Sequence, residues 1–200
     1  MHIKGQICAE PECERRHLTG AEHCILHLPD PEEYQERLLH LLREEQLHEN
    51  LHLEGVDLRG LNMEKHRFVD CVFDDALFAE CSFAESVALA SRFQNARFES
   101  CRFSGCDVKY CIFSGAQFKD CDFSGSDILH SNFNGINGRD LNFSDSDLYY
   151  STFVLSRLDN VRFMDCNLKK VSYIGSVREN VNFKYSNYEE ADFSAEEFPG

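Results

Sequence analysis

The chain has 200 residues, of which 42% are hydrophobic, so it is long enough for one domain with a buried core and a small appendage. It contains 17 Phe, 10 Cys and no Trp, and its formal net charge is −15. This acidic balance argues against direct nucleic-acid binding through a basic face. The opening stretch MHIKGQICAEPE has no apolar run typical of a signal peptide or a membrane span, which predicts a cytoplasmic location with no membrane association.

Residues 1–29 are predicted to form a small zinc-binding knuckle. The stretch CAEPECERRHLTGAEHCILH has the spacing C-x4-C-x10-C-x2-H, in which two close pairs are separated by a loop. Such a set suits a tetrahedral structural Zn²⁺, and its four donors leave no open position for catalysis. It resembles small zinc-binding knuckles, with the ligands Cys8, Cys13, Cys24 and His27.

Other interpretations of this segment stay open. His17 and His23 are alternative nitrogen ligands. The three thiols also suit a redox-labile cluster, or an N-terminal loop whose cysteines have no special role.

Residues 30–55 are predicted to form a capping helix and a linker. Asp30 is a suitable N-cap, Pro31 suits the first helical turn, and an apolar stripe follows, so we expect a helix from Pro31 to His48. Because the open end of a solenoid needs a cover, the helix is interpreted as a cap, with a partner-binding or dimerising helix as the alternative. The histidines of this segment are expected to be solvated: His40, His48 and His52.

A strict five-residue period begins at Leu58 and continues to Phe193. It has 28 positions in one phase, and only Ala88, Gly138 and Arg178 among them are not large and apolar. Five fits neither the 3.6-residue period of a helix nor the two-residue period of a flat strand. It indicates a chain that turns a corner every five residues, with one large and one small side chain of each side pointing inward.

A second period of twenty residues indicates that four sides make one coil. Residues twenty apart show shared preferences, and two opposite columns are largely aromatic. One of them is Met63, Phe83, Phe103, Phe123, Phe143, Phe163 and Phe183. The other is Phe73, Phe93, Phe113, Phe133, Phe153, Tyr173 and Phe193.

These repeats resemble the pentapeptide-repeat proteins over about residues 56–193, and stretches such as CDFSG, SDLYY, CNLKK and ADFSA match the family pattern well. The resemblance implies an all-β solenoid, a right-handed quadrilateral β-helix of about seven coils. At the spacing of adjacent strands this rod is roughly 34 Å long. The knuckle and the capping helix precede it, and residues 194–200 form a C-terminal tail.

Seven cysteines occupy the small inward slot of the repeat, where Ala and Ser also occur. We expect them to be reduced, inert core residues, because a thiol in apolar surroundings has a raised pKa and stacked parallel side chains do not easily reach disulfide geometry. They are Cys71, Cys81, Cys101, Cys106, Cys111, Cys121 and Cys166.

Two positions break the inward pattern. Gly138 and Arg178 share a column, so the wall there is expected to bulge or recess, and Val177 or a backbone shift is expected to accommodate the arginine. In the tail, Phe198 keeps the phase and is expected to fold over the last coil. Because this cap is thin, a homodimer is a further expectation.

Outward positions are mostly polar, so apolar ones are informative. Asp107, Asp127 and Asp147 share a face and are interpreted as turn-forming residues, with cation or partner binding as the alternative. The apolar outward residues are predicted to form the surface for a partner: Tyr110, Leu129, Tyr149, Tyr150, Val154, Leu155 and Ile174.

The sequence contains no nucleophile–base pair, phosphate loop or cofactor fingerprint, so an enzyme is not expected. The favoured hypothesis is a non-enzymatic scaffold that binds an unidentified protein partner. The resemblance also implies an alternative, a topoisomerase-binding protein that mimics DNA, because some pentapeptide-repeat proteins that confer quinolone resistance act in this way. A metal or redox sensor centred on the N-terminal cysteines is the third hypothesis.

Overall fold

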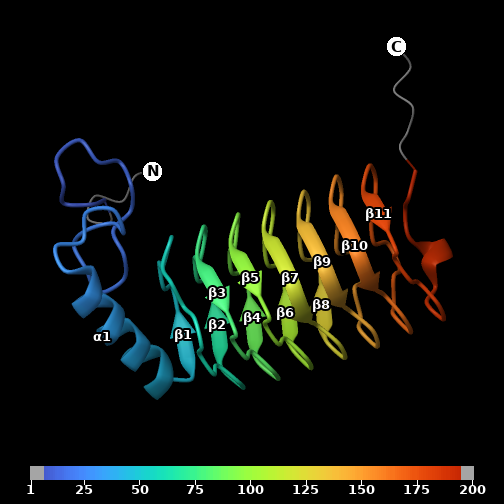
Figure 1. The fold of residues 1–200 in the computed structure, drawn as a ribbon, viewed down its shortest axis with the longest axis horizontal. Coiled ribbons are helices and arrows are strands. Elements are labelled where there is room, and N and C mark those ends of the chain that lie inside the picture. The colour runs from blue at the N-terminus through green and yellow to red at the C-terminus, as the bar shows by residue number, and fades with distance from the viewer. Residues whose placement is uncertain (1–6, 195–200) are drawn as a thin grey trace, which may run out of the picture.

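A computed structural model describes residues 7–194, which form an elongated solenoid with a helix and a small module at its N-terminal end (Figure 1). The predicted all-β solenoid is therefore confirmed. Within this range, no helix has both the length and the apolar character needed to cross a membrane.

Each coil of the solenoid takes twenty residues, and every coil pairs in parallel with the next. On one side, seven successive pairings lead from His52 to Asp192 in steps of twenty, as the sequence period predicts. Two sides carry sheets with the strand orders β1-β2-β4-β6-β8 and β11-β10-β9-β7-β5-β3. The strands are β1 (Leu47–Glu49), β2 (Arg67–Val69), β3 (Leu77–Ala79), β4 (Val87–Leu89), β5 (Arg97–Glu99), β6 (Asp107–Lys109), β7 (Gln117–Asp122), β8 (Asp127–Leu129), β9 (Asn137–Asn142), β10 (Arg157–Arg162) and β11 (Val177–Glu179). A 3₁₀ helix, η1 (Tyr188–Glu190), lies in the last coil.

Stacked aromatic rings fill the interior. Within a column the rings lie face to face, as for Phe103 and Phe123, whose centroids are 4.5 Å apart with planes 2° from parallel. Neighbouring columns meet edge to face, as for Phe118 and Phe123 at 5.6 Å and 70°. Aromatic pairs favour offset stacked and edge-to-face arrangements, so the repeated phenylalanine contributes specific ring contacts beyond apolar burial.

The small inward slot contributes hydrogen bonds as well as volume. Cys106 Sγ lies 2.9 Å from the carbonyl oxygen of Phe83, and Ser126 Oγ donates at 2.8 Å to the carbonyl oxygen of Phe103. In both pairs the acceptor is 23 residues earlier in the chain. The slot therefore favours Cys and Ser because each can donate to a core carbonyl while remaining small.

Burial raises the pKa of individual repeat cysteines. It raises the pKa of Cys111 to about 12 and that of Cys166 to about 11. All seven are buried and none of the cysteines within residues 7–194 forms a disulfide. A thiol with such a pKa is protonated at neutral pH and is a poor nucleophile.

Gly138 lies in register between Phe118 and Leu158, so the wall there does not bulge. Larger side chains in the adjacent small slots fill the space that a side chain at this position would take. A Cβ at Gly138 would lie 2.7 Å from Leu141 Cδ1 and 3.6 Å from Ile136 Cδ1. The side chains of Leu141 and Ile136 therefore fill the recess that was expected at Gly138.

The prediction for Arg178 was wrong. Its strand pairs in register with β10, and Val177 is 46% exposed, so neither a backbone shift nor Val177 shields the arginine. Instead Arg178 is exposed on the last coil, where its guanidinium donates to the carbonyl oxygen of Tyr173 at 3.2 Å and lies 4.9 Å from the ring centroid of Phe193. The end of the solenoid leaves room for this orientation, which an interior coil would not.

Helix α1 (Pro31–Glu44) covers the N-terminal end of the solenoid, as Figure 1 shows. Its N-cap is Asp30, whose Oδ1 accepts from the amide of Glu33 at 2.9 Å, which confirms the predicted start. The buried residues of the helix belong to the same apolar cluster as the solenoid core: Tyr34, Leu38 and Leu42. This continuity supports the capping interpretation.

The predicted end of the helix at His48 was wrong. The chain becomes extended at Glu45, and β1 (Leu47–Glu49) pairs with β2 as the first strand of the solenoid. His48 therefore points inward and stacks on Phe68 at 4.9 Å. His48 and His52 are buried, contrary to the expectation that they are solvated, whereas His40 is exposed. The five-residue repeat therefore extends into residues 47–55, where histidine and leucine occupy the first inward positions.

Candidate metal centre and partner surface

Two turns of the N-terminal module position the predicted metal ligands. The first turn is closed by an antiparallel pairing of Ile7 with Arg16 and by the amide of Cys8 donating to the carbonyl of Arg15 at 2.9 Å. The second turn is closed by the amide of His27 donating to the carbonyl of Cys24 at 3.0 Å. Each turn brings the two members of one close pair to the same point.

The side chains of the two turns converge. The donor atoms of Cys8, Cys13, Cys24 and His27 all lie within 4.8 Å of one another. Cys13 Sγ is 3.9 Å from Cys24 Sγ, and His27 Nδ1 is 3.4 Å from Cys8 Sγ and 3.5 Å from Cys24 Sγ.

The separations of these three pairs match those around a tetrahedral ion. Zn–S and Zn–N bonds of about 2.3 and 2.0 Å place two sulfurs roughly 3.8 Å apart, and a sulfur and a nitrogen roughly 3.5 Å apart. The nitrogen in the cluster is that of His27. His17 is turned elsewhere, with its Nδ1 2.9 Å from the carbonyl oxygen of Leu18, and His23 is also outside the cluster.

The surroundings of the cluster shift the pKa values of two of its thiols in opposite directions. Desolvation opposes ionisation of Cys8, but hydrogen bonds from the backbone of Cys24 and Glu10 and from His27 lower its pKa to about 6. The pKa of Cys13 is raised: a hydrogen bond from the backbone of Arg15 lowers it, but desolvation and the neighbouring thiols together outweigh that bond. One ligand is thus largely a thiolate before a cation arrives, and a cation would drive off the remaining thiol protons.

The loop between the two candidate ligand pairs contacts the rest of the protein. The amide of His52 donates to Thr19 Oγ1 at 2.7 Å, and Tyr34 Oη of α1 donates to the carbonyl of Thr19 at 3.0 Å. Leu18 beside it is buried in the common core. The loop between Cys13 and Cys24 therefore joins the module to both the helix and the first coil.

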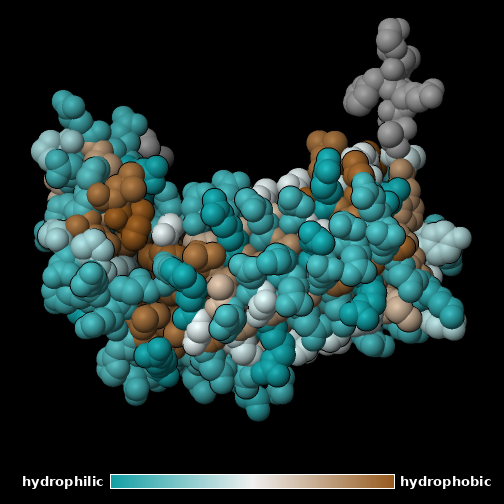
Figure 2. Space-filling view, in the orientation of Figure 1, coloured by the Kyte–Doolittle hydropathy of each residue, from teal (hydrophilic) through white to brown (hydrophobic). Residues whose placement is uncertain are grey.

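The predicted partner residues lie on adjoining sides and corners of the middle and later coils. The most exposed are Leu155 at 73%, Tyr110 at 58% and Tyr150 at 42%. The other four are half-buried: Leu129, Tyr149, Val154 and Ile174. In the face seen in Figure 2, apolar side chains gather over the N-terminal module and the later coils, while the middle of the rod is mostly hydrophilic.

Sequence reasoning missed one member of this surface. His130 lies between Tyr110 and Tyr150, with its ring stacked on both at 5.2 and 5.1 Å. The twenty-residue period places His130 between Tyr110 and Tyr150 in the sequence. His130 was left out of the predicted surface because histidine was not counted among the apolar outward residues.

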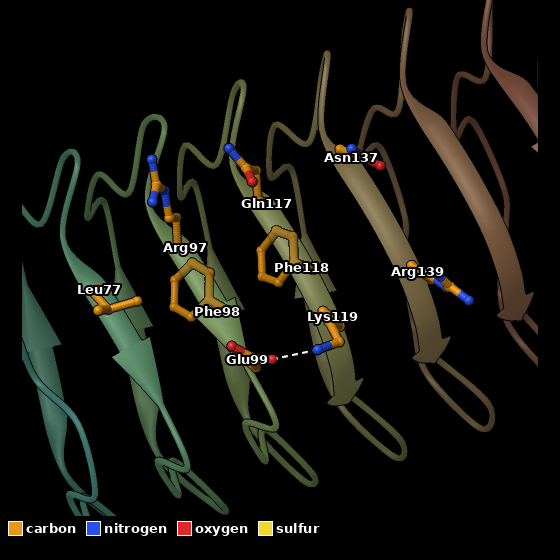
Figure 3. Close-up of a pocket in the computed structure, with 9 residues that line it drawn as sticks. All are labelled: Leu77, Arg97, Phe98, Glu99, Gln117, Phe118, Lys119, Asn137 and Arg139. Carbon is orange, nitrogen blue, oxygen red and sulfur yellow. Dashed lines mark hydrogen bonds and ion pairs between the residues drawn. The ribbon is translucent and has the colours of Figure 1, made fainter.

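A shallow groove crosses the sheet that contains β3, β5, β7 and β9 (Figure 3), and it has a volume of about 350 Å³. Three of its four charged lining residues, Glu99, Lys119 and Arg139, take part in ion pairs. Lys119 Nζ is 2.5 Å from Glu99 Oε1, and Arg139 is 3.4 Å from Asp140. Among its lining residues there is no nucleophile beside a base, so the groove gives no indication of catalysis.

The chain belongs to the pentapeptide-repeat family. The profile described as a pentapeptide repeat region matches residues 116–193, and the one described as pentapeptide repeats (9 copies) matches residues 68–112 and 88–127. The predicted resemblance is thereby confirmed for the solenoid. No curated protein sequence matches the chain.

Solved structures of the same kind show low identity. HetL, a pentapeptide repeat protein involved in heterocyst differentiation regulation in the cyanobacterium Nostoc, is 9% identical with a TM-score of 0.37, over 78% of this chain and 94% of HetL. A trypsin-treated form of QnrB1, a plasmid-mediated fluoroquinolone resistance protein, is 22% identical with a TM-score of 0.36, over 71% of this chain and 78% of that chain. Rfr23 from the cyanobacterium Cyanothece is 12% identical with a TM-score of 0.27, over 80% and 99% of the two chains.

Proposed function

We propose that the protein is a non-enzymatic scaffold that binds another protein through the side of its β-helix, with a structural zinc site in residues 1–29. The repeat solenoid is the shared family framework, and its filled aromatic core leaves surfaces rather than a cavity for function. The observation that carries the proposal is the exposure of three large apolar side chains, those of Tyr110, Tyr150 and Leu155, on the middle and later coils.

Zinc has a structural role in this proposal. The four donors of Cys8, Cys13, Cys24 and His27 would complete a tetrahedral shell and leave no position for substrate. The ion would hold the loop that carries Thr19 against the first coil and α1. Residues 30–55 then act as the capping segment, which covers a solenoid end that would otherwise expose unpaired backbone.

Metal analysis tests the zinc site. Purified protein is expected to contain one zinc per chain, and Cys24→Ser is expected to lose it. Cys166→Ser is the matched control, because Cys166 lies in the solenoid core and is not part of the cluster. Absence of stoichiometric zinc from the unmodified protein would sink this part of the proposal.

Affinity capture from the native host tests the scaffold. The double variant Tyr149→Asp/Leu155→Asp is expected to lose partners that the unmodified protein retains. Val177→Asp/Tyr185→Asp is the matched control, because it adds the same charge at residues exposed near the C-terminal end. Retention of every partner by the first variant would show that the apolar surface is not the interface.

Two alternatives make different predictions. Topoisomerase binding by DNA mimicry predicts inhibition in a supercoiling assay, and no effect at high excess of protein dismisses it. A metal or redox sensor predicts that zinc loss or mild oxidation changes partner capture, whereas a purely structural zinc changes stability without changing which partner binds.

A further inference from the structure

One corner of the solenoid carries a ladder of stacked side chains. Tyr110, His130, Tyr150 and Lys170 are twenty residues apart, and each has a positive φ of 52–60° that points it outward in the same direction. The Tyr110 and His130 rings are 5.2 Å apart and 19° from parallel, and the His130 and Tyr150 rings are 5.1 Å apart and 11° from parallel.

A cation closes the C-terminal end of this ladder. Lys170 Nζ lies 4.7 Å from the ring centroid of Tyr150 and donates to Tyr150 Oη at 2.7 Å. The ammonium thus lies beside the hydroxyl of the last tyrosine in the column, and this hydrogen bond closes that end of the ladder.

The N-terminal end of the ladder is open. The next residue in the column is Ala90, which has the same backbone conformation with φ 51° but no side chain beyond Cβ. Among residues 7–194, Tyr110 has a ring contact only with His130, and it is 58% exposed. The opposite face of the Tyr110 ring is thus available above Ala90.

An acidic residue that forms no ion pair with the described residues lies one coil further toward the N-terminal end of this column. Asp70 follows Ala90 in the same column with φ 53° and is exposed. It takes part in none of the ion pairs formed by the described part of the chain. The nearby Lys109 is already paired, with its Nζ 2.9 Å from Asp107. Two coil spacings of ~4.8 Å separate the levels of Tyr110 and Asp70, which is room for one flat group between them.

We propose that the space above Ala90 is a docking slot for an arginine side chain of the protein partner. A guanidinium is flat, so it stacks on Tyr110 as the next member of the ladder, and its charge is balanced by Asp70. The formal net charge of −15 also favours a positively charged partner. The inference rests on the proposed scaffold function and names the chemistry that one point of its interface recognises.

Titration with short peptides tests the slot without requiring the native partner. The probes are acetyl-Ser-Gly-Arg-Gly-Ser-amide and two matched peptides in which the arginine is replaced by lysine or by citrulline, which has a similar shape but no charge. The readout is the NMR signal of the Tyr110 ring in the full-length protein. We expect saturable shifts, with the arginine peptide binding about tenfold more tightly than the citrulline peptide.

Variants assign the binding to the slot. Ala90→Arg would fill the slot from within the chain, so it is expected to abolish binding, and Tyr110→Ala is expected to do the same. Asp70→Asn is expected to weaken binding of the arginine peptide severalfold and to reduce its salt dependence. Ala84→Arg is the matched control, because it adds the same side chain on another side of the coil.

The results separate this slot from the broader function. Equal binding of the arginine and citrulline peptides, no saturable shift of Tyr110, or unchanged binding to the Ala90→Arg variant would each overturn the slot. None of these outcomes concerns partner capture by the Tyr149 and Leu155 surface, so the scaffold proposal stands or falls by its own experiment.

Discussion

His48 is expected to make the stability of the protein depend on pH. Its ring is 1% exposed, is stacked on Phe68 and has its Nε2 3.2 Å from His66 Nδ1, while its own Nδ1 has no hydrogen-bond partner among the described residues. Burial and the neighbouring His66 lower the pKa of His48 from 6.5 to about 4. Protonation would put a charge in the first coil without a counter-ion.

The sign and size of the effect follow from linkage. Between pH 6.5 and pH 4 the unfolded chain binds a proton at His48 and the folded chain does not, so the free energy of unfolding falls as the pH is lowered through this range. Each unit of pKa difference corresponds to about 1.4 kcal/mol, so His48 alone is expected to remove about 3 kcal/mol between pH 7 and pH 4. His52 and His66 also have lowered pKa values because of burial, and they act in the same direction.

The assay is urea unfolding followed by circular dichroism between pH 7 and pH 4. His48→Phe replaces the ring by one that cannot titrate but can still stack on Phe68, and it is expected to lose much less stability on acidification. His40→Gln is the matched control, because His40 is exposed on α1. Acid effects on carboxylates and on the N-terminal Cys3His cluster are common to both variants and cancel in the comparison.

A pH dependence of His48→Phe equal to that of His40→Gln would refute this reasoning. An NMR titration of the His48 ring gives an independent result, since a pKa near 6.5 in the folded protein would contradict the effect of burial.

Three further changes have expected outcomes. A strong chelator is expected to lower the thermal midpoint of the protein, and Cys24→Ser is expected to have a low midpoint already and no response to the chelator, whereas Cys166→Ser still responds. Gly138→Ala is expected to lower the free energy of unfolding in urea by about 1–3 kcal/mol, because its Cβ would lie 2.7 Å from Leu141 Cδ1. In a protein that also carries Leu141→Ala, the same change at Gly138 should cost less. Additive costs of the two substitutions would contradict the packing argument. Ser126→Ala is expected to cost roughly 1–3 kcal/mol in the same assay, since it removes one donor to a buried carbonyl and one acceptor for a buried amide, and a cost near zero would show that the slot needs only small volume.

The periods of five and twenty residues were sufficient to predict the solenoid. Each coil pairs with the next in the same register, so a residue such as Phe103 repeatedly meets its equivalents above and below, and the column is visible in a single sequence. The clustering of Cys8, Cys13 and Cys24 was also accessible, because ligands within each close pair are held near one another by short turns. Whether zinc binds there stays a prediction. The prediction for Phe198 concerns a residue outside the range that the structure describes.

The two ends and the outer corners depended on the tertiary structure. At His48 the local pattern suited a helix, but pairing with β2 gave the backbone hydrogen bonds that a first strand needs and turned the ring inward. At Arg178 the pattern predicted an inward side chain, but no further coil covers that position within the described chain, and the guanidinium lies over Phe193 instead. The ladder from Tyr110 to Lys170 likewise required the stacked corners. Sequence periodicity by itself determined the repeating interior, because every interior coil has the same neighbours; the tertiary structure decided the places where a neighbour is missing or changes.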